Sequence, residues 1–155
     1  MTPPFQYLPI QDATVRAVRT ALRDEHGNAL QVQVSDSDTA PCRSCLRATP
    51  RGTRLILFAH RPFAIDGPYA ETGPVFVHAD NCEPYRARDV FPPDFRARRL
   101  VFRAYDARGA IHAATLADGV DAEQTLAQQF ADPAVARVHV RNPAWGCFDF
   151  AVERG

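Results

Sequence analysis

Two pairs of residues in this sequence have the types and spacing of metal ligands. Cys42 and Cys45 are separated by two residues, and His78 and Cys82 by three. Two thiolates at the first spacing can bind one ion from a single turn, and a second pair completes a tetrahedral zinc site. The sequence therefore predicts that Cys42, Cys45, His78 and Cys82 bind zinc. Because four protein ligands leave no open coordination position, this site would be structural.

Other interpretations of the cysteines stay open. They could be small buried apolar residues, or Cys42 and Cys45 could form a redox pair or a disulfide. Glycine is common near the second cysteine of a zinc knuckle, where this chain has Leu46. Cys147 could also replace one member of the second pair as the fourth ligand. A thioredoxin-like site is disfavoured, because no strand–helix–strand unit leads into Cys42.

Cys147 is also a candidate nucleophile, with His139 as its base and Asp149 orienting the histidine. A turn over residues 142–146 would place Arg141 directly across from Cys147 and His139 diagonally across. A nearby cation lowers the pKa of a thiol and raises the fraction of reactive thiolate. The same residues could equally be ordinary cross-strand pairs on a solvated face. The sequence does not decide whether the protein is an enzyme.

A pocket for a small anionic ligand is the third candidate. Two predicted strands, residues 99–106 and 136–141, carry arginines on their outward faces, with Tyr105 and His139 among them. If the strands are neighbours, their guanidinium groups converge on a site suited to a carboxylate or a phosphate. Alternatively, they form a solvated face balanced by acidic side chains. The ligand-binding candidates are Arg99, Arg103, Tyr105, Arg137 and Arg141, and Arg103 or Arg141 could serve the Cys147 site.

A proline-bounded loop is a further feature. The stretch GPYAETGP, residues 67–74, has a Gly-Pro unit at each end, which predicts a rigid loop. Its Tyr69 and Glu71 side chains could point toward one place, and loops of this kind often carry function. The alternative is that the loop only turns a corner.

Composition excludes several classes of function. The 155 residues have a formal net charge of zero, so no overall field attracts nucleic acid. All 18 basic residues are arginine, which excludes a catalytic or phosphate-binding lysine. There is no Gly-x-Ser-x-Gly, His-Glu-x-x-His, phosphate-loop or Rossmann glycine motif. A serine hydrolase is therefore not expected.

The sequence also bounds the compartment and partners. Its first residues lack the pattern of a signal peptide, and the longest apolar run, residues 55–59, is too short to cross a bilayer. We therefore expect a cytoplasmic protein without a membrane partner. In that compartment the four cysteines are expected to be thiols or metal ligands. A protein partner, or a homodimer formed through edge strands, stays open.

The sequence predicts an α+β fold for the domain that positions these candidate residues. Helical spacing of apolar residues predicts one helix from residue 11 that ends at Gly27, and a second over 121–132 capped by Asp121. Strands are predicted at 30–35, 54–60 and 73–79, followed by a hairpin over 98–119 with Gly109 in its turn. Two more strands surround residues 142–146. The expectation is a single compact domain, residues 1–155, with an antiparallel-rich or mixed sheet of about six to seven short strands and two helices.

The last hairpin allows a register prediction. Pairing Arg141 with Cys147 places Val140 opposite Phe148, His139 opposite Asp149 and Val138 opposite Phe150. Both valines and both phenylalanines would then share the core face. His139, Arg141, Cys147 and Asp149 would share the other face, turned away from the core.

Four stretches together resemble a bacterial family known as domain of unknown function 1203. They are PCRSCL, GPYAETGPVFVHA, RRLVFRAYDARGAI and FADPAVARVHVRNPAWGCF, in this order within residues 41–150. The resemblance implies one compact domain and no established activity. The cysteine after Pro41 and the one in GCF resemble recurrent family features, whereas Cys45 and Cys82 match the family less generally.

Overall fold

The computed structural model describes residues 4–155 and has an α+β architecture with two α-helices. Its ten strands form three sheets, and every strand pair is antiparallel. The predicted class and the two helices are confirmed. The elements are β1 (Phe5–Leu8), α1 (Asp12–Ala21), β2 (Val32–Val34), β3 (Ala40–Pro41), β4 (Ala48–Thr49), β5 (Arg54–His60), β6 (Gly73–His78), β7 (Arg99–Asp106), β8 (Ile111–Asp118), α2 (Ala122–Phe130), β9 (Val135–Arg141) and β10 (Phe148–Arg154), with short 3-10 turns at Pro93–Phe95 and Gly119–Asp121.

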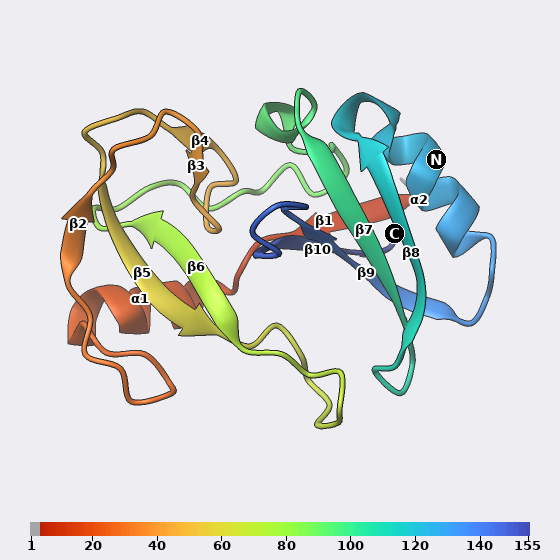
Figure 1. Cartoon of the computed structure of the whole chain (residues 1–155), viewed down its shortest axis with the longest axis horizontal. Helices are drawn as coiled ribbons and strands as arrows, with labels where there is room; N and C mark the ends of the chain where they lie inside the picture. Colours follow the sequence, from red (N-terminus) through yellow and green to blue (C-terminus); the bar gives the residue numbers. More distant parts are fainter. Residues whose placement is uncertain (1–3) are drawn as a thin grey trace.

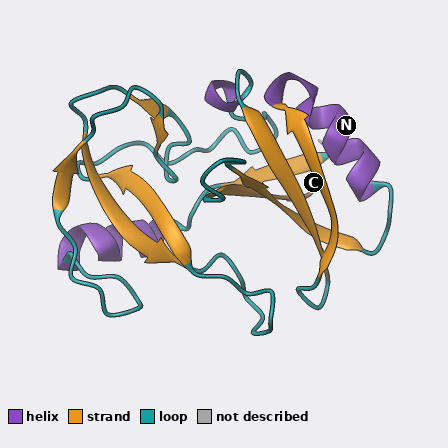
Figure 2. Ribbon diagram, viewed as in Figure 1, coloured by secondary structure: helices purple, strands orange, loops and turns teal. Residues whose placement is uncertain are grey.

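Two larger sheets lie side by side, each with one helix (Figures 1 and 2). The five-stranded sheet has the order β1-β10-β9-β7-β8 and packs against α2. The three-stranded sheet has the order β2-β5-β6, and α1 covers it. The pair β3-β4 forms the third sheet. Neither helix of the described chain is long and apolar enough to span a membrane.

Strands β9 and β10 are buried on both faces, because two hydrophobic cores meet at them. One core lies under α2 and includes Val138, Val140 and Phe150. The other lies between α1, the three-stranded sheet and β10, and includes Phe148 and Ala151. A strand between two cores needs apolar or paired side chains at both parities.

The register predicted for the last hairpin is wrong. Arg141 pairs with Phe148 and Val140 with Phe150, since a β-bulge at Asp149 inserts one extra residue. Val138, Val140 and Phe150 share one core face as predicted, but Phe148 lies on the opposite face. That opposite face does not turn away from the core. His139, Arg141 and Asp149 are all buried there.

Other local predictions hold or need adjustment. The β7–β8 hairpin forms, with Gly109 at a φ of +84°, and α2 begins after Asp121. Helix α1 ends earlier than predicted, since Leu22 takes the left-handed conformation that closes it. The predicted count of six to seven strands omitted β1, β3 and β4, which are two to four residues long.

Gly119 connects β8 to α2 where two backbone segments touch. A Cβ atom at this position would lie 2.1 Å from the carbonyl oxygen of Phe95 and 2.8 Å from the Cα of Arg96. Backbone cannot yield as a flexible side chain can, so we expect Gly119→Ala to lower the free energy of unfolding by about 2–3 kcal/mol. Urea denaturation measures this loss. Gly67→Ala, whose Cβ would meet no atom within 4 Å, is the control and should stay within about 0.5 kcal/mol of wild type. Equal losses in both variants would contradict the close approach.

Candidate metal centre and anion site

The Cys42–Cys45 pair lies on a tight turn between β3 and β4. The amide of Cys42 donates to the carbonyl of Arg47 at 3.0 Å, and the amide of Leu46 donates to the carbonyl of Cys42 at 2.9 Å. Leu46 has a φ of +57°, the left-handed conformation that glycine takes most easily. Its side chain is buried in the core under α2, and this packing offsets the backbone cost. The turn therefore forms without the glycine that its shape favours.

The structure brings all four predicted metal ligands together. The ligand atoms of Cys42, Cys45, His78 and Cys82 lie within 4.8 Å of one another. The Sγ atoms of Cys42 and Cys82 are 3.8 Å apart, and Cys45 Sγ is 3.7 Å from His78 Nδ1. Ideal tetrahedral zinc geometry places two sulfurs about 3.8 Å apart, and a sulfur and a nitrogen about 3.6 Å apart. The cluster is thus compact enough for one ion to contact all four atoms.

Hydrogen-bond donors surround the cluster. The Nη2 of Arg19, on α1, lies 3.3 Å from Cys82 Sγ, and its Nε donates to the carbonyl of His78 at 3.0 Å. The amide of His78 lies 3.3 Å from Cys42 Sγ. Donors of this kind stabilise thiolates and fix the orientation of metal ligands. Arg19 also connects α1 to the cluster.

Contacts within the cluster shift the pKa values of all four side chains. A hydrogen bond with Cys45 lowers the pKa of the Cys42 thiol, and one with Cys42 lowers the pKa of the Cys82 thiol. The bond with Cys42 raises the pKa of Cys45 in return. Hydrogen bonds to Cys42 and Cys82 raise the pKa of His78 to about 10. Thiolate character in this cluster is the property that attracts a soft divalent cation.

Cys147 lies away from this cluster, and its two predicted partners are engaged elsewhere. His139 is 1% exposed and packs its ring against Phe63, Tyr105 and Phe148. Burial, together with nearby arginines, lowers the pKa of His139 well below its usual value. Asp149 lies 3.3 Å from a guanidinium nitrogen of Arg43. Within residues 4–155, no hydrogen bond joins Cys147 to either of them.

The predicted anion-site residues lie on one face of two paired strands. Strands β7 and β9 are neighbours, with Arg103 opposite His139 and Tyr105 opposite Arg137. However, the four arginines do not all contact the same acidic residue. Arg99 contacts Asp118 and Arg137 contacts Glu153, whereas Arg103 and Arg141 converge.

Arg103 and Arg141 converge on the carboxylate of Glu71. Arg103 Nη1 donates to Glu71 Oε1 at 2.9 Å, and Arg141 Nη1 lies 3.5 Å from Oε2. Glu71 belongs to the loop between β5 and β6, which lies between the two large sheets (Figure 1). The proline-bounded loop therefore places a carboxylate at the meeting point of the two arginines.

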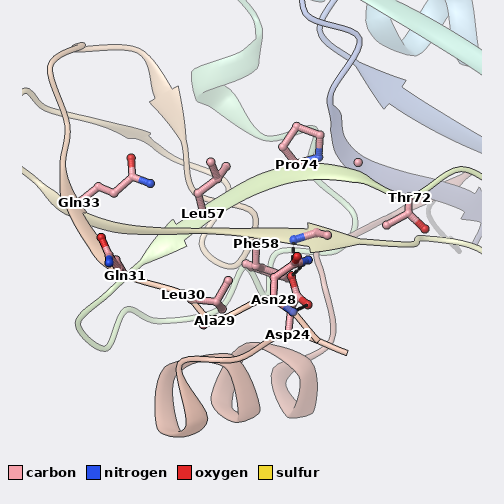
Figure 3. A pocket seen from close by; sticks show the side chains of 12 residues that line it. Asp24, Asn28, Ala29, Leu30, Gln31, Gln33, Leu57, Phe58, Thr72 and Pro74 are labelled. Atoms are coloured by element: carbon pink, nitrogen blue, oxygen red, sulfur yellow. Dashed lines mark hydrogen bonds between the residues drawn. The ribbon is translucent and has the colours of Figure 1, made fainter. Parts of the chain in front are cut away.

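A separate groove of about 510 Å³ lies between the segment after α1 and strand β5 (Figure 3). Its one charged lining residue among the described residues is Asp24, which accepts bonds from Asn28 and from the amides of His26 and Ala59. Burial raises the pKa of Asp24, but these hydrogen bonds outweigh it and hold the pKa at about 2. The carboxylate thus fixes the loop and is not free for a ligand.

Sequence reasoning missed two residues that shape these sites. Arg19 lies on α1, far along the chain from the ligands it contacts, and only the helical face it shares with Val15 and Val18 hints at burial. Arg43 lies inside the cysteine turn and is buried, with its guanidinium directed at β10. No spacing pattern distinguishes either arginine from the others in the chain.

Comparison with known proteins gives one match. The family model described as "Protein of unknown function (DUF1203)" matches residues 39–154, which include every candidate ligand described above. No curated protein and no solved structure matches the chain.

Proposed function

This chain belongs to the DUF1203 family, whose function is unknown, and we propose that it is a zinc-stabilised domain that binds a small anionic ligand. The observation that carries the zinc assignment is the spacing of the four ligand atoms, which lie within 4.8 Å of one another. Three thiols and one imidazole favour zinc over the hard cations, which prefer oxygen ligands.

The proposed zinc has a structural role. Three sulfurs and one nitrogen fill a tetrahedral shell and leave no position for a reacting water. The ligands come from the β3–β4 turn, the end of β6 and the loop after it, and Arg19 adds α1. One ion would therefore connect the β3–β4 turn to the end of β6 and the loop after it, in addition to their main-chain hydrogen bonds. A redox role for Cys42 and Cys45 is the weaker alternative, since His78 and Cys82 stand beside both thiols.

The anion-binding part of the proposal depends on Arg103 and Arg141. Arg141 is only 5% exposed, and a buried guanidinium needs an anionic partner. The alternative of an enzyme that uses Cys147 remains a prediction. Burial of His139 and its lowered pKa argue against that residue as a base.

Metal analysis tests the zinc assignment. Protein purified under reducing conditions without added metal should contain about one zinc per chain. Cys82→Ser should lose most of this zinc, because a ligand is removed. Cys147→Ser should keep it, because Cys147 lies outside the cluster. A wild-type protein that contains no zinc and binds none in a zinc titration would refute the assignment.

A further inference from the structure

A cavity of about 310 Å³ lies between the β5–β6 loop and the turn that joins β9 to β10. At roughly 30 Å³ per non-hydrogen atom, it has room for on the order of ten atoms. This is the small end of the range for ligand pockets. Its lining includes Glu71, Arg103, Arg141, Trp145, Cys147 and Phe148.

The cavity has an excess of positive charge. Two guanidinium groups, those of Arg103 and Arg141, face the single carboxylate of Glu71. His60 also lines the cavity, but burial lowers its pKa to about 4, so it is neutral at pH 7. One uncompensated positive charge in a partly enclosed site attracts anions.

Glu71 is a weakly held partner for these arginines. Its side chain is 50% exposed, while that of Arg141 is 5% exposed. An exposed carboxylate gains little from an ion pair, because water solvates it almost as well. A buried guanidinium without an anion is much less favourable. Arg141 Nη1 also donates to the carbonyl of Gly146 at 2.9 Å, but this neutral partner leaves its charge uncompensated. The charge therefore favours an anion at this position, and Glu71 loses little when another anion replaces it.

The same strand face carries buried polar atoms that lack a partner in the described chain. Burying a polar atom without a hydrogen bond is costly, and such atoms are rare away from functional sites. Of the eight such atoms in the described chain, four lie on one face of the β7–β9 pair. They are Tyr105 Oη, Arg137 Nε, His139 Nδ1 and Arg141 Nε, and Arg141 is the member of this set that lines the cavity.

We propose that Glu71 is an internal stand-in for the carboxylate of a small organic acid, which displaces it from Arg103 and Arg141. The two arginines contact different oxygens of one planar carboxylate, which is the group this site already accommodates. Trp145, which is 83% exposed, and Phe148 cover the apolar part of the acid. This inference rests on the anion-binding part of the proposed function and is independent of zinc.

Titration with phenylacetate, followed by calorimetry and by the fluorescence of Trp145, tests this inference. Trp145 is the single tryptophan of the chain, so its signal reports on this cavity alone. Glu71→Gln removes the internal competitor and should bind phenylacetate at least tenfold more tightly than wild type. Arg103→Gln should bind it at least tenfold more weakly. Arg54→Gln alters an exposed, ion-paired arginine outside the cavity and should leave the affinity unchanged.

Inorganic phosphate is the comparison ligand. Tighter binding of phosphate than of phenylacetate to Glu71→Gln would overturn the assignment of a carboxylate but leave an anion site in place. Equal affinities of wild type and Glu71→Gln for phenylacetate would overturn the role of Glu71 as a competitor. If neither anion binds to wild type or to Glu71→Gln, both this inference and the anion-binding function are wrong. Zinc content is measured on the same samples, so a failure of the metal assignment is seen separately.

Discussion

If the proposed zinc is bound, we expect a Cys45→Ser variant to lose about 5 kcal/mol of its free energy of unfolding and its melting temperature to fall by about 10–20 °C. Serine fills nearly the same space as cysteine but is a poor ligand for zinc. A structural zinc site contributes on the order of 10 kcal/mol in small metal-binding domains. Loss of one of four ligands removes a large part of that contribution. The drop is measured by thermal and urea denaturation of the reduced protein.

Treatment with a chelator distinguishes the stability lost with the metal from the stability lost through altered side-chain packing. A buried Cys→Ser change without metal costs about 1–3 kcal/mol, because the hydroxyl is left without a partner. If zinc is responsible, a strong chelator should bring wild type close to Cys45→Ser, and the variant itself should respond little to chelator. Cys147→Ser should melt as wild type does, and chelator should lower its midpoint equally. A wild-type midpoint that chelator leaves unchanged contradicts a structural metal.

The cluster of candidate metal ligands was predictable from sequence because its signals are local. Cys42 and Cys45 lie within one turn, and His78 and Cys82 are four positions apart at the end of β6 and in the loop after it. The short spacing of each pair therefore indicates that its members are close. That the two pairs meet depends on the β3–β4 turn packing beside β6, where the amide of Arg43 donates to the carbonyl of Phe76. The sequence contains no direct indication of that contact.

The β7–β8 hairpin was predictable for a different reason. Leu100, Phe102 and Ala104 share one face of the strand, Arg99, Arg103 and Tyr105 share the other, and Gly109 marks the turn, so pattern and turn chemistry agree. The last hairpin shows a similar alternation, but the register predicted from it is wrong. A bulge at Asp149 leaves no mark in the pattern, and it moves Phe148 to the opposite face.

Polar residues on β9 and β10 were expected in solvent because charge usually indicates exposure. Here the second face packs against another core, and each charged group is paired by residues distant in sequence. Asp149 meets Arg43, and Arg141 meets Glu71. Buried polar residues become interpretable only when such partners are known. The pairing of β7 with β9 likewise followed from topology that no local pattern encodes.

The second large loss of stability is expected on substitution of Arg43, because this residue connects the cysteine turn to β10. Its Nε donates to the carbonyl of Phe148 at 2.8 Å and its Nη1 to the carbonyl of Pro41 at 2.8 Å. Its Nη2 lies 3.3 Å from Asp149 Oδ1, and both side chains are almost fully buried. Removing one member of a buried ion pair leaves an unpaired charge. We expect Arg43→Met to lower the free energy of unfolding by about 3–5 kcal/mol at pH 8.

The cost of Arg43→Met should depend on pH. Burial raises the pKa of Asp149 to about 6, even though Arg43 opposes that rise. A carboxyl whose folded pKa lies above its unfolded value of about 3.9 stabilises the fold below that value, and the contribution is lost as pH rises toward 6. Without Arg43 the folded pKa rises further, so the variant loses more stability than wild type between pH 5 and pH 8.

Urea denaturation at pH 5 and at pH 8 measures this difference, with Asp149→Asn as the matched background. An amide does not ionise, so adding Arg43→Met to Asp149→Asn should cost less at pH 8 than Arg43→Met costs alone. The cost in that background should also be the same at both pH values. A cost of Arg43→Met that is equal at pH 5 and pH 8 in the wild-type background would show that Asp149 is not the buried charge that Arg43 compensates. The stabilising role of Arg43 would then reduce to its two bonds to main-chain carbonyls, and the loss should fall to about 1–3 kcal/mol.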